Sequence, residues 1–121
     1  LLTEAGRRIS ALLDIPEVRY VFERGGRAVE LLREQPVDSV SGDRWFSGTI
    51  DRLHIHRGKT GGVTAVEIID FKTDAVQDAD ELVWRHAPQM MTYQEMMVKA
   101  YPAAEVTCLL VSTRLGKVVK L

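Results

Sequence analysis

Two aspartates and a lysine close two neighbouring apolar stretches of the chain. Asp51 follows the stretch 48–50 (Gly-Thr-Ile), and Asp70 ends the stretch 66–69 (Val-Glu-Ile-Ile), two residues before Lys72. If both stretches are strands, both carboxylates point inward at the end of an apolar surface. Adjacent buried carboxylates repel each other, so one takes up a proton unless a cation lies between them. Because oxygen ligands suit hard divalent ions, this pattern predicts a site for Mg²⁺ or Mn²⁺.

A hairpin would bring the two carboxylates together. The sequence Gly-Lys-Thr-Gly-Gly between the two stretches has the composition of a hairpin loop. We take residues 59–62 as the loop, so that Gly58 faces Val63. The same register sets Asp51 opposite Asp70, with a separation of about 4.5–5.5 Å between their Cβ atoms.

One face of this hairpin is then mostly apolar. Alternation along the strands gives that face seven residues: Asp51, Leu53, Ile55, Val66, Ile68, Asp70 and Lys72. In the alternative interpretation, Asp51 and Asp70 form surface ion pairs with the nearby Arg52 and Lys72. A slip of one residue in the register would also separate the carboxylates onto opposite faces, so their pairing depends on this register.

The elements that position these residues follow from hydrophobic periodicity and from turn residues. Their predicted order is helices at 3–13 and 17–22, strands at 29–40, 45–57 and 63–72, a helix at 80–99, and strands at 104–113 and 117–121. Residues 27–34 are good helix formers, so the start of the first strand is ambiguous. Pro88 could break the long helix. The order predicts an α+β fold with a mixed β-sheet.

Composition and charge narrow the function classes. The chain has 121 residues, of which 45% are hydrophobic and 27% charged, as expected for a single globular domain. Sixteen basic residues against seventeen acidic ones exclude nucleic-acid binding by bulk positive charge. Binding to nucleic acid would therefore need a local site, or basic surface elsewhere in a larger protein.

Cysteine content and the chain start bear on the cellular compartment. The single cysteine, Cys108, excludes an internal disulfide framework and a zinc site built from cysteines, and favours a reducing compartment. No apolar run reaches the roughly 20 residues that a membrane span needs. The chain starts at Leu1 without the pattern of a signal peptide. We therefore expect a piece of a longer cytoplasmic protein with no membrane partner.

Four motifs in order resemble one nuclease family. The segments 48–53 and 69–73 (Ile-Asp-Phe-Lys-Thr) resemble the nuclease domain of RecB-like and AddA-like helicase–nucleases, in the PD-(D/E)xK superfamily. The segment 89–93 (Gln-Met-Met-Thr-Tyr) is similar to the Gln-x-x-x-Tyr motif of the helix after the catalytic hairpin. Residues 34–37 (Glu-Gln-Pro-Val) are similar to the Glu-x-Pro-aromatic stretch of the first core strand, with Val37 replacing the aromatic residue. The resemblance covers about Glu34 to Val111.

The resemblance implies a fold and an activity. The fold would be a restriction-endonuclease-like core, a mixed β-sheet flanked by helices, with residues 1–121 forming one domain from the C-terminal part of a longer helicase–nuclease. The activity would be Mg²⁺-dependent (or Mn²⁺-dependent) hydrolysis of DNA of the exodeoxyribonuclease type, in DNA repair and recombination. The partners would be DNA, the rest of the parent chain and a partner subunit.

The resemblance also implies roles for matched residues. Asp51 and Asp70 would be metal ligands together with the backbone carbonyl of Phe71. Lys72 would orient the attacking water or neutralise charge developing on the phosphate. The supporting, DNA-facing residues would be Glu34, Gln89 and Tyr93. In the alternative interpretation, Tyr93 is a tyrosine at the edge of the core and Gln89 is its hydrogen-bonding neighbour.

One departure from the family leaves alternatives open. Family members usually carry an upstream histidine on a helix as a further metal ligand, but no histidine precedes His54. Either the segment that carries it lies before Leu1 in the full protein, or this member lacks it. The alternatives are an inactive module of the same fold that binds DNA or protein, and a stand-alone nuclease of the same superfamily. A third is an unrelated α+β domain in which Asp51 and Asp70 lie far apart.

Other residues of interest receive simpler interpretations. His54 and His56 could be a metal pair, but their strand face is opposite that of Asp51, with His54 across from Glu67. A solvated or lightly packed face is the favoured interpretation. His86 precedes Gln89 by three residues and could face the same cleft. Trp84 could stack on a base or sugar, but a packing role is the favoured interpretation. The remaining candidates are expected to pack in the core: Met90, Met91, Met96, Met97 and Cys108.

Overall fold

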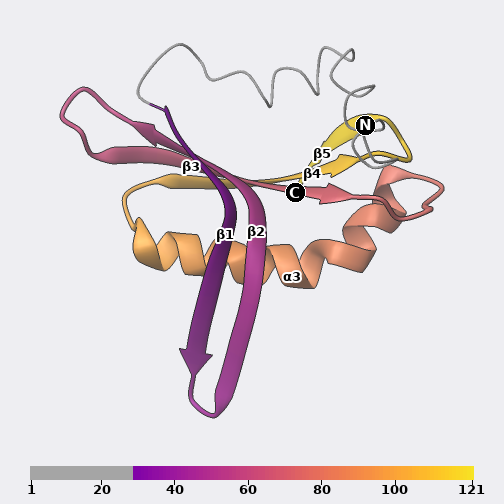
Figure 1. Ribbon diagram of the computed structural model, residues 1–121, viewed down its shortest axis with the longest axis horizontal. Coiled ribbons are helices and arrows are strands. Elements are labelled where there is room, and N and C mark those ends of the chain that lie inside the picture. Colours follow the sequence, from indigo (N-terminus) through magenta and orange to yellow (C-terminus); the bar gives the residue numbers. More distant parts are fainter. Residues whose placement is uncertain (1–28) are drawn as a thin grey trace, which may run out of the picture.

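The computed structural model describes residues 29–121, which form one mixed five-stranded sheet and one helix. The helices predicted at 3–13 and 17–22 lie outside the described residues. The strands are β1 (Val29–Ser41), β2 (Arg44–Arg57), β3 (Val63–Lys72), β4 (Glu105–Ser112) and β5 (Lys117–Lys120), and the helix is α3 (Ala79–Ala100). The strand order is β1-β2-β3-β4-β5, and only the pair of β3 and β4 is parallel. The α+β fold and its restriction-endonuclease-like mixed sheet are confirmed (Figure 1).

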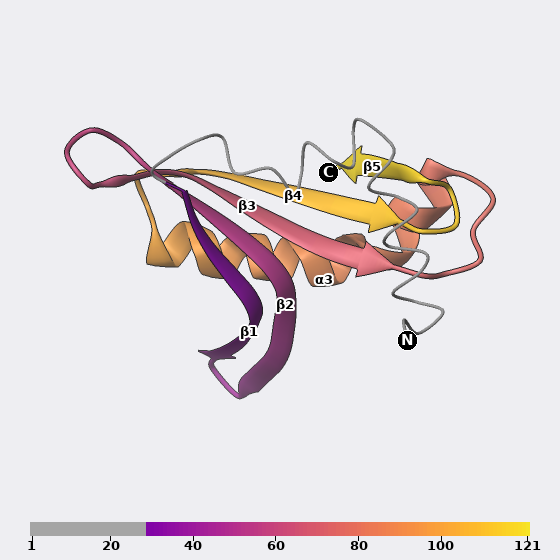
Figure 2. The same ribbon diagram turned by 45° about the horizontal axis from the view of Figure 1, so that its top comes forward.

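Helix α3 is the crossover that joins the two parallel strands, as Figure 2 shows. Asp78 caps its start by accepting a hydrogen bond from the backbone N–H of Glu81 at 2.9 Å. The negative charges of Asp80 and Glu81 in the first turn interact favourably with the positive end of the helix dipole. The helix continues through Pro88, which lies on its exposed side. The carbonyl that loses its partner there can be hydrated, so the helix tolerates this proline without ending.

The core lies between α3 and one face of the sheet. Helix residues Leu82, Met90, Tyr93 and Met97 are buried against alternate strand residues, which include Leu53, Val66, Ile68 and Leu110. The opposite face of the sheet has a smaller apolar cluster around Ile69 and Val111. Cys108 is buried as predicted, and burial raises the pKa of its thiol to about 11. No helix within residues 29–121 has the length and hydropathy that a membrane span requires.

The β2–β3 hairpin has the predicted register over most of its length. Leu53 pairs with Ile68, and Ile55 pairs with Val66. The predicted pairing of Gly58 with Val63 is wrong, because a bulge between His56 and Arg57 sets Arg57 opposite Val63. The loop is therefore one residue longer than predicted, and Gly61 adopts the positive φ of 86° that closes it.

Strands β1 and β2 extend beyond the sheet as a two-stranded arm. Their pairing runs from Val29–His56 to Ser41–Arg44, whereas the pairing of β2 with β3 ends at Arg52–Ile69. Beyond this point the arm bends away from β3, toward the side of the sheet that α3 covers (Figures 1 and 2). Asp51 is therefore the first residue of β2 past the fork where β2 and β3 separate.

Candidate active site

Asp51 bridges the fork through its side chain. Its Oδ2 atom accepts a hydrogen bond of 2.8 Å from the backbone N–H of Phe71, so a carboxylate takes the place of the next ladder bond. Its carboxyl group also shares a hydrogen bond with that of Asp70. The two aspartates thus lie together, as the hairpin register predicts.

The environment of the two carboxyl groups favours a shared proton. Burial and the hydrogen bond to Asp70 raise the pKa of Asp51 to about 6, although the Phe71 N–H and the charge of Lys72 act in the opposite direction. Asp70 itself is buried. The pair therefore has the property expected of two close carboxylates without a cation between them.

The raised pKa of Asp51 gives a pH-dependent stability in metal-free solution. Because the folded-state pKa (about 6) exceeds the ordinary value of 3.8, the stabilisation from protonated Asp51 is complete below about pH 4 and is lost as the pH rises through 6. We expect the free energy of unfolding of Asp51→Asn to rise relative to that of the unmutated chain between pH 4 and 6. This difference should persist above pH 6. Urea unfolding of both chains in a chelator measures this difference, and a difference that does not vary with pH would contradict the shared proton.

Lys72 lies beside Asp70 on the same strand face. Its Nζ atom is 2.7 Å from Asp70 Oδ2 and donates a hydrogen bond of 3.1 Å to Gln89 Oε1. The side chains of Lys72 and Asp70 are only 15% and 7% exposed, so solvent screens this ion pair weakly. The pair holds the ammonium group next to the two carboxylates.

Gln89 and Tyr93 continue the network from α3 to the arm. They lie one helical turn apart, and Gln89 Nε2 donates to the Tyr93 hydroxyl at 3.3 Å. The Tyr93 hydroxyl donates to the backbone carbonyl of Thr49 at 3.2 Å, and burial raises its pKa. This chain of contacts fixes Lys72 relative to both the helix and the arm.

Gly48 lets the arm approach Tyr93. A Cβ atom at Gly48 would lie 2.8 Å from the Tyr93 hydroxyl and 3.2 Å from the Phe46 ring. The two rings pack edge to face with centroids 5.8 Å apart, which leaves no room for a methyl group. The sequence alone gives no sign of this close approach.

We expect Gly48→Ala to destabilise the fold by about 1–3 kcal/mol, because it overpacks the contact between the arm and α3. Chemical denaturation measures this loss. Gly62→Ala is the matched control, since its added Cβ would have nothing within 4 Å. Equal stability of the two variants would show that Tyr93 does not hold the arm in this way.

A comparison with models of protein families identifies the superfamily of the chain. A model of the PD-(D/E)XK nuclease superfamily matches residues 4–119. The chain belongs to this superfamily. No curated protein matches the chain.

The cluster of Asp51, Asp70 and Lys72 has the donor set that a hard divalent cation prefers. Asp51 and Asp70 supply carboxylate oxygens, and a cation between them would replace the shared proton. Nucleases of this superfamily use divalent metals, and the residues present fit one. That these residues hold the metal remains a proposal, as does the part of the Phe71 carbonyl.

Glu34 does not join this PD-(D/E)XK cluster. It lies opposite Asp51 at the one position where the β1–β2 ladder is interrupted, with a φ of 48°, and its side chain is exposed. Within residues 29–121 it makes no hydrogen bond or ion pair with the cluster. Its supporting role stays a prediction.

Three other residues that the sequence singles out lie outside this cluster. His86 does not contact the cluster but pairs with Asp74, with 3.0 Å between His86 Nε2 and Asp74 Oδ2. Trp84 and Met91 are exposed on the outer side of α3 instead of packing in the core, because that side faces away from the sheet. Met90 and Met97 are buried as predicted.

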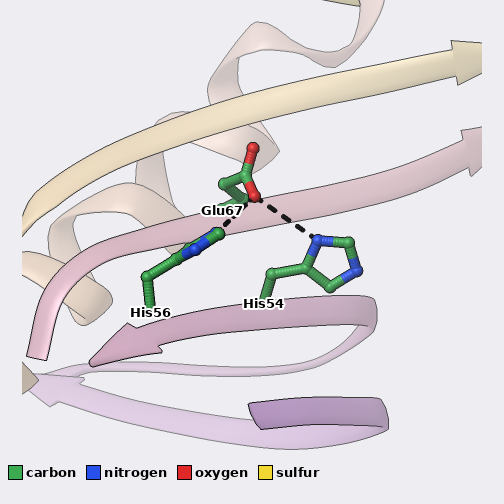
Figure 3. A group of neighbouring side chains, drawn as sticks. All are labelled: His54, His56 and Glu67. Carbon is green, nitrogen blue, oxygen red and sulfur yellow. Dashed lines mark hydrogen bonds and ion pairs between the residues drawn. The ribbon is translucent and has the colours of Figure 1, made fainter. Parts of the chain in front are cut away.

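The face of β2 opposite Asp51 has a cluster of three polar side chains, of which the sequence indicated the pairing of His54 with Glu67. His54 and His56 meet the carboxylate of Glu67, which lies opposite His54 on β3 (Figure 3). Hydrogen bonds from the two imidazoles lower the pKa of Glu67 to about 2, against the effect of burial. The face is therefore a polar cluster that is closed around the buried His54 and open to solvent at His56 and Glu67.

Proposed function

We propose that this chain is the divalent-metal-dependent DNA nuclease domain of a RecB/AddA-like helicase–nuclease. The observation that carries the proposal is the meeting of Asp51 and Asp70 at the fork, with Lys72 beside them, in a member of a nuclease superfamily. The reaction is hydrolysis of a DNA phosphodiester bond with Mg²⁺ or Mn²⁺.

The carboxylates hold the metal in this proposal. Asp51 and Asp70, with the Phe71 carbonyl, would bind it at the fork, and the bound ion supplies an acidified water and a polarised phosphate. The hydrogen bond from the Phe71 N–H to Oδ2 holds the Asp51 carboxyl group in place and leaves Oδ1 for the metal. Burial of Asp70 limits competition from water for the same position.

Lys72 stabilises charge on the phosphate. Its ammonium group lies between Asp70 and Gln89, where it can counter the negative charge that builds on the phosphoryl oxygens. Gln89 positions Lys72, and Tyr93 positions Gln89 by its bond to the Thr49 carbonyl. This arrangement is set before substrate binds, which is what efficient charge stabilisation requires.

The helicase–nuclease context rests on motifs and charge. The four motifs occur in the order of RecB-like and AddA-like nuclease domains, and the near-neutral charge suits a strand delivered by a motor rather than captured by a basic surface. A stand-alone nuclease and an inactive binding module remain the rival functions.

Digestion of linear and covalently closed DNA tests the proposal. We expect the purified chain to degrade linear DNA with Mg²⁺ or Mn²⁺, to spare closed circles, and to lose all cleavage in a chelator. Cleavage of closed circles would favour a stand-alone endonuclease. DNA binding without cleavage in either metal would favour the inactive module.

A further inference from the structure

A second set of metal-ligand side chains converges on the sheet face opposite Asp51. His54 and His56 are two residues apart on β2, so alternation points both to the same face, and Glu67 is the direct partner of His54 on β3. Figure 3 shows both imidazole rings turned toward the Glu67 carboxylate. Glu67 Oε1 is 3.4 Å from His54 Nδ1 and 2.7 Å from His56 Nε2, and the three ligand atoms lie within 4.8 Å of one another.

These spacings come close to those of a tetrahedral zinc site. With metal–ligand bonds of about 2.0–2.1 Å, two ligand atoms on one Zn²⁺ lie about 3.3 Å apart. The His54–Glu67 separation of 3.4 Å already matches this value. The 2.7 Å between His56 and Glu67 must widen by about 0.6 Å, which a small rotation of the half-exposed His56 provides.

We propose that His54, His56 and Glu67 form a second metal site, specific for a transition metal of the Zn²⁺ class. Two imidazole nitrogens, which are borderline ligands, together with one carboxylate oxygen suit Zn²⁺, whereas the all-oxygen set of Asp51 and Asp70 suits Mg²⁺. The two sites use opposite faces of β2, so this inference does not rest on the proposed nuclease function.

One of the three side chains is buried, and the other two are open to solvent. The His54 side chain is 4% exposed, whereas those of His56 and Glu67 are 36% and 28% exposed. His54 therefore holds its position by packing, and the other two ligands reach solvent. A metal can enter from that side and keep water as its fourth ligand.

The hydrogen bond from Arg52 to His54 works against metal binding and therefore gives the proposal a specific test. Its Nε–H donates to His54 Nε2 at 2.8 Å, so this nitrogen is unprotonated and the ring proton is on Nδ1, facing Glu67. A metal on Nδ1 requires the proton to be carried by Nε2, which then cannot accept from Arg52. Binding must therefore turn the Arg52 side chain away from His54.

Arg52→Gln is expected to strengthen the site. The amide oxygen of glutamine can accept a hydrogen bond from the protonated Nε2 of His54, the arrangement that metal-bound histidines usually have. Second-layer partners of this kind change metal affinity by about 10–100-fold, so we expect Zn²⁺ to bind this variant at least about tenfold more tightly.

Calorimetric titration with ZnCl₂ tests the site, and the visible absorption of bound Co²⁺ reports its geometry. All chains lack a histidine tag and carry Asp51→Asn and Asp70→Asn, which removes the carboxylate pair, and circular dichroism checks their folds. We expect one Zn²⁺ per chain, lost in His56→Ala and in the isosteric Glu67→Gln. His86→Ala is the matched control and should bind Zn²⁺ as tightly as the parent chain, which here means the chain with only Asp51→Asn and Asp70→Asn.

Three results would overturn the proposal. One is the absence of saturable Zn²⁺ binding by the parent chain. Another is a His56→Ala or Glu67→Gln chain that binds Zn²⁺ as tightly as the parent. The third is an Arg52→Gln chain with unchanged or weaker affinity, because Nδ1 of His54 would then not be the ligand atom.

Discussion

Asp70→Asn is expected to abolish metal-dependent DNA cleavage while the chain stays folded. Asparagine has nearly the same shape, so the buried position next to Asp51 remains filled. It cannot supply a second negative charge, and a divalent cation loses the charge pair that would hold it. Cleavage of linear DNA under Mg²⁺ should therefore fall to background.

The control for this variant is Asp80→Asn. Asp80 is exposed in the first turn of α3, away from the cluster, and its loss should leave cleavage unchanged. Circular dichroism and thermal melting of both variants separate loss of activity from loss of fold. A folded Asp70→Asn chain that still cleaves would remove Asp70 from the metal site.

Lys72→Met is expected to lower the cleavage rate by about 10²–10³-fold, the usual cost of removing one group that stabilises transition-state charge. Methionine keeps much of the aliphatic stem but has no charge to place near the phosphate. Metal binding should persist, because both carboxylates remain. Cleavage rate and metal binding together therefore distinguish the role of Lys72 from that of the proposed metal ligands.

The measurement for Lys72→Met is single-turnover cleavage together with the rise in melting temperature on adding Mn²⁺. Lys99→Met is the matched control, since Lys99 is exposed at the end of α3. A Lys72→Met chain that cleaves at the rate of the control would assign the lysine a structural role only. A chain that loses its Mn²⁺ response would mean that Lys72 organises the carboxylates instead.

The meeting of Asp51 and Asp70 could be predicted because strand geometry is periodic. Alternation fixes which residues share a face, and the glycine-rich loop fixes which strands form the hairpin. The described strands and helix begin and end within one residue of the predicted boundaries. The loop was predicted one residue too short, because a bulge such as that after His56 has no clear signature in the sequence.

Contacts made by the arm could not be predicted. The hydrogen bond from Tyr93 to the Thr49 carbonyl depends on where β2 leaves β3, and a backbone carbonyl has no signature in side-chain pattern. Nor could the positive φ of Glu34, at which the pairing of β1 with β2 is interrupted, be predicted from the motif. Motif spacing therefore located the two aspartates and the lysine, but not the arm that surrounds them.

The polar cluster of β2 shows a different limit. The pattern His-x-His and its position across from Glu67 were visible in the sequence. The rotamers that turn both rings onto one carboxylate oxygen were not, because they depend on burial of His54 and on its bond to Arg52. Spacing alone favoured a solvated face for this reason.

Metal titration monitored by thermal melting tests the central claim most directly. A cation that binds only the folded chain raises its melting temperature in proportion to the logarithm of its concentration once sites fill. We predict that Mg²⁺, which the proposed histidine site does not suit, stabilises the unmutated chain and not Asp51→Asn, which keeps an oxygen acceptor for the Phe71 N–H. Equal stabilisation of the two chains, or none in either, would contradict a metal site at Asp51 and Asp70.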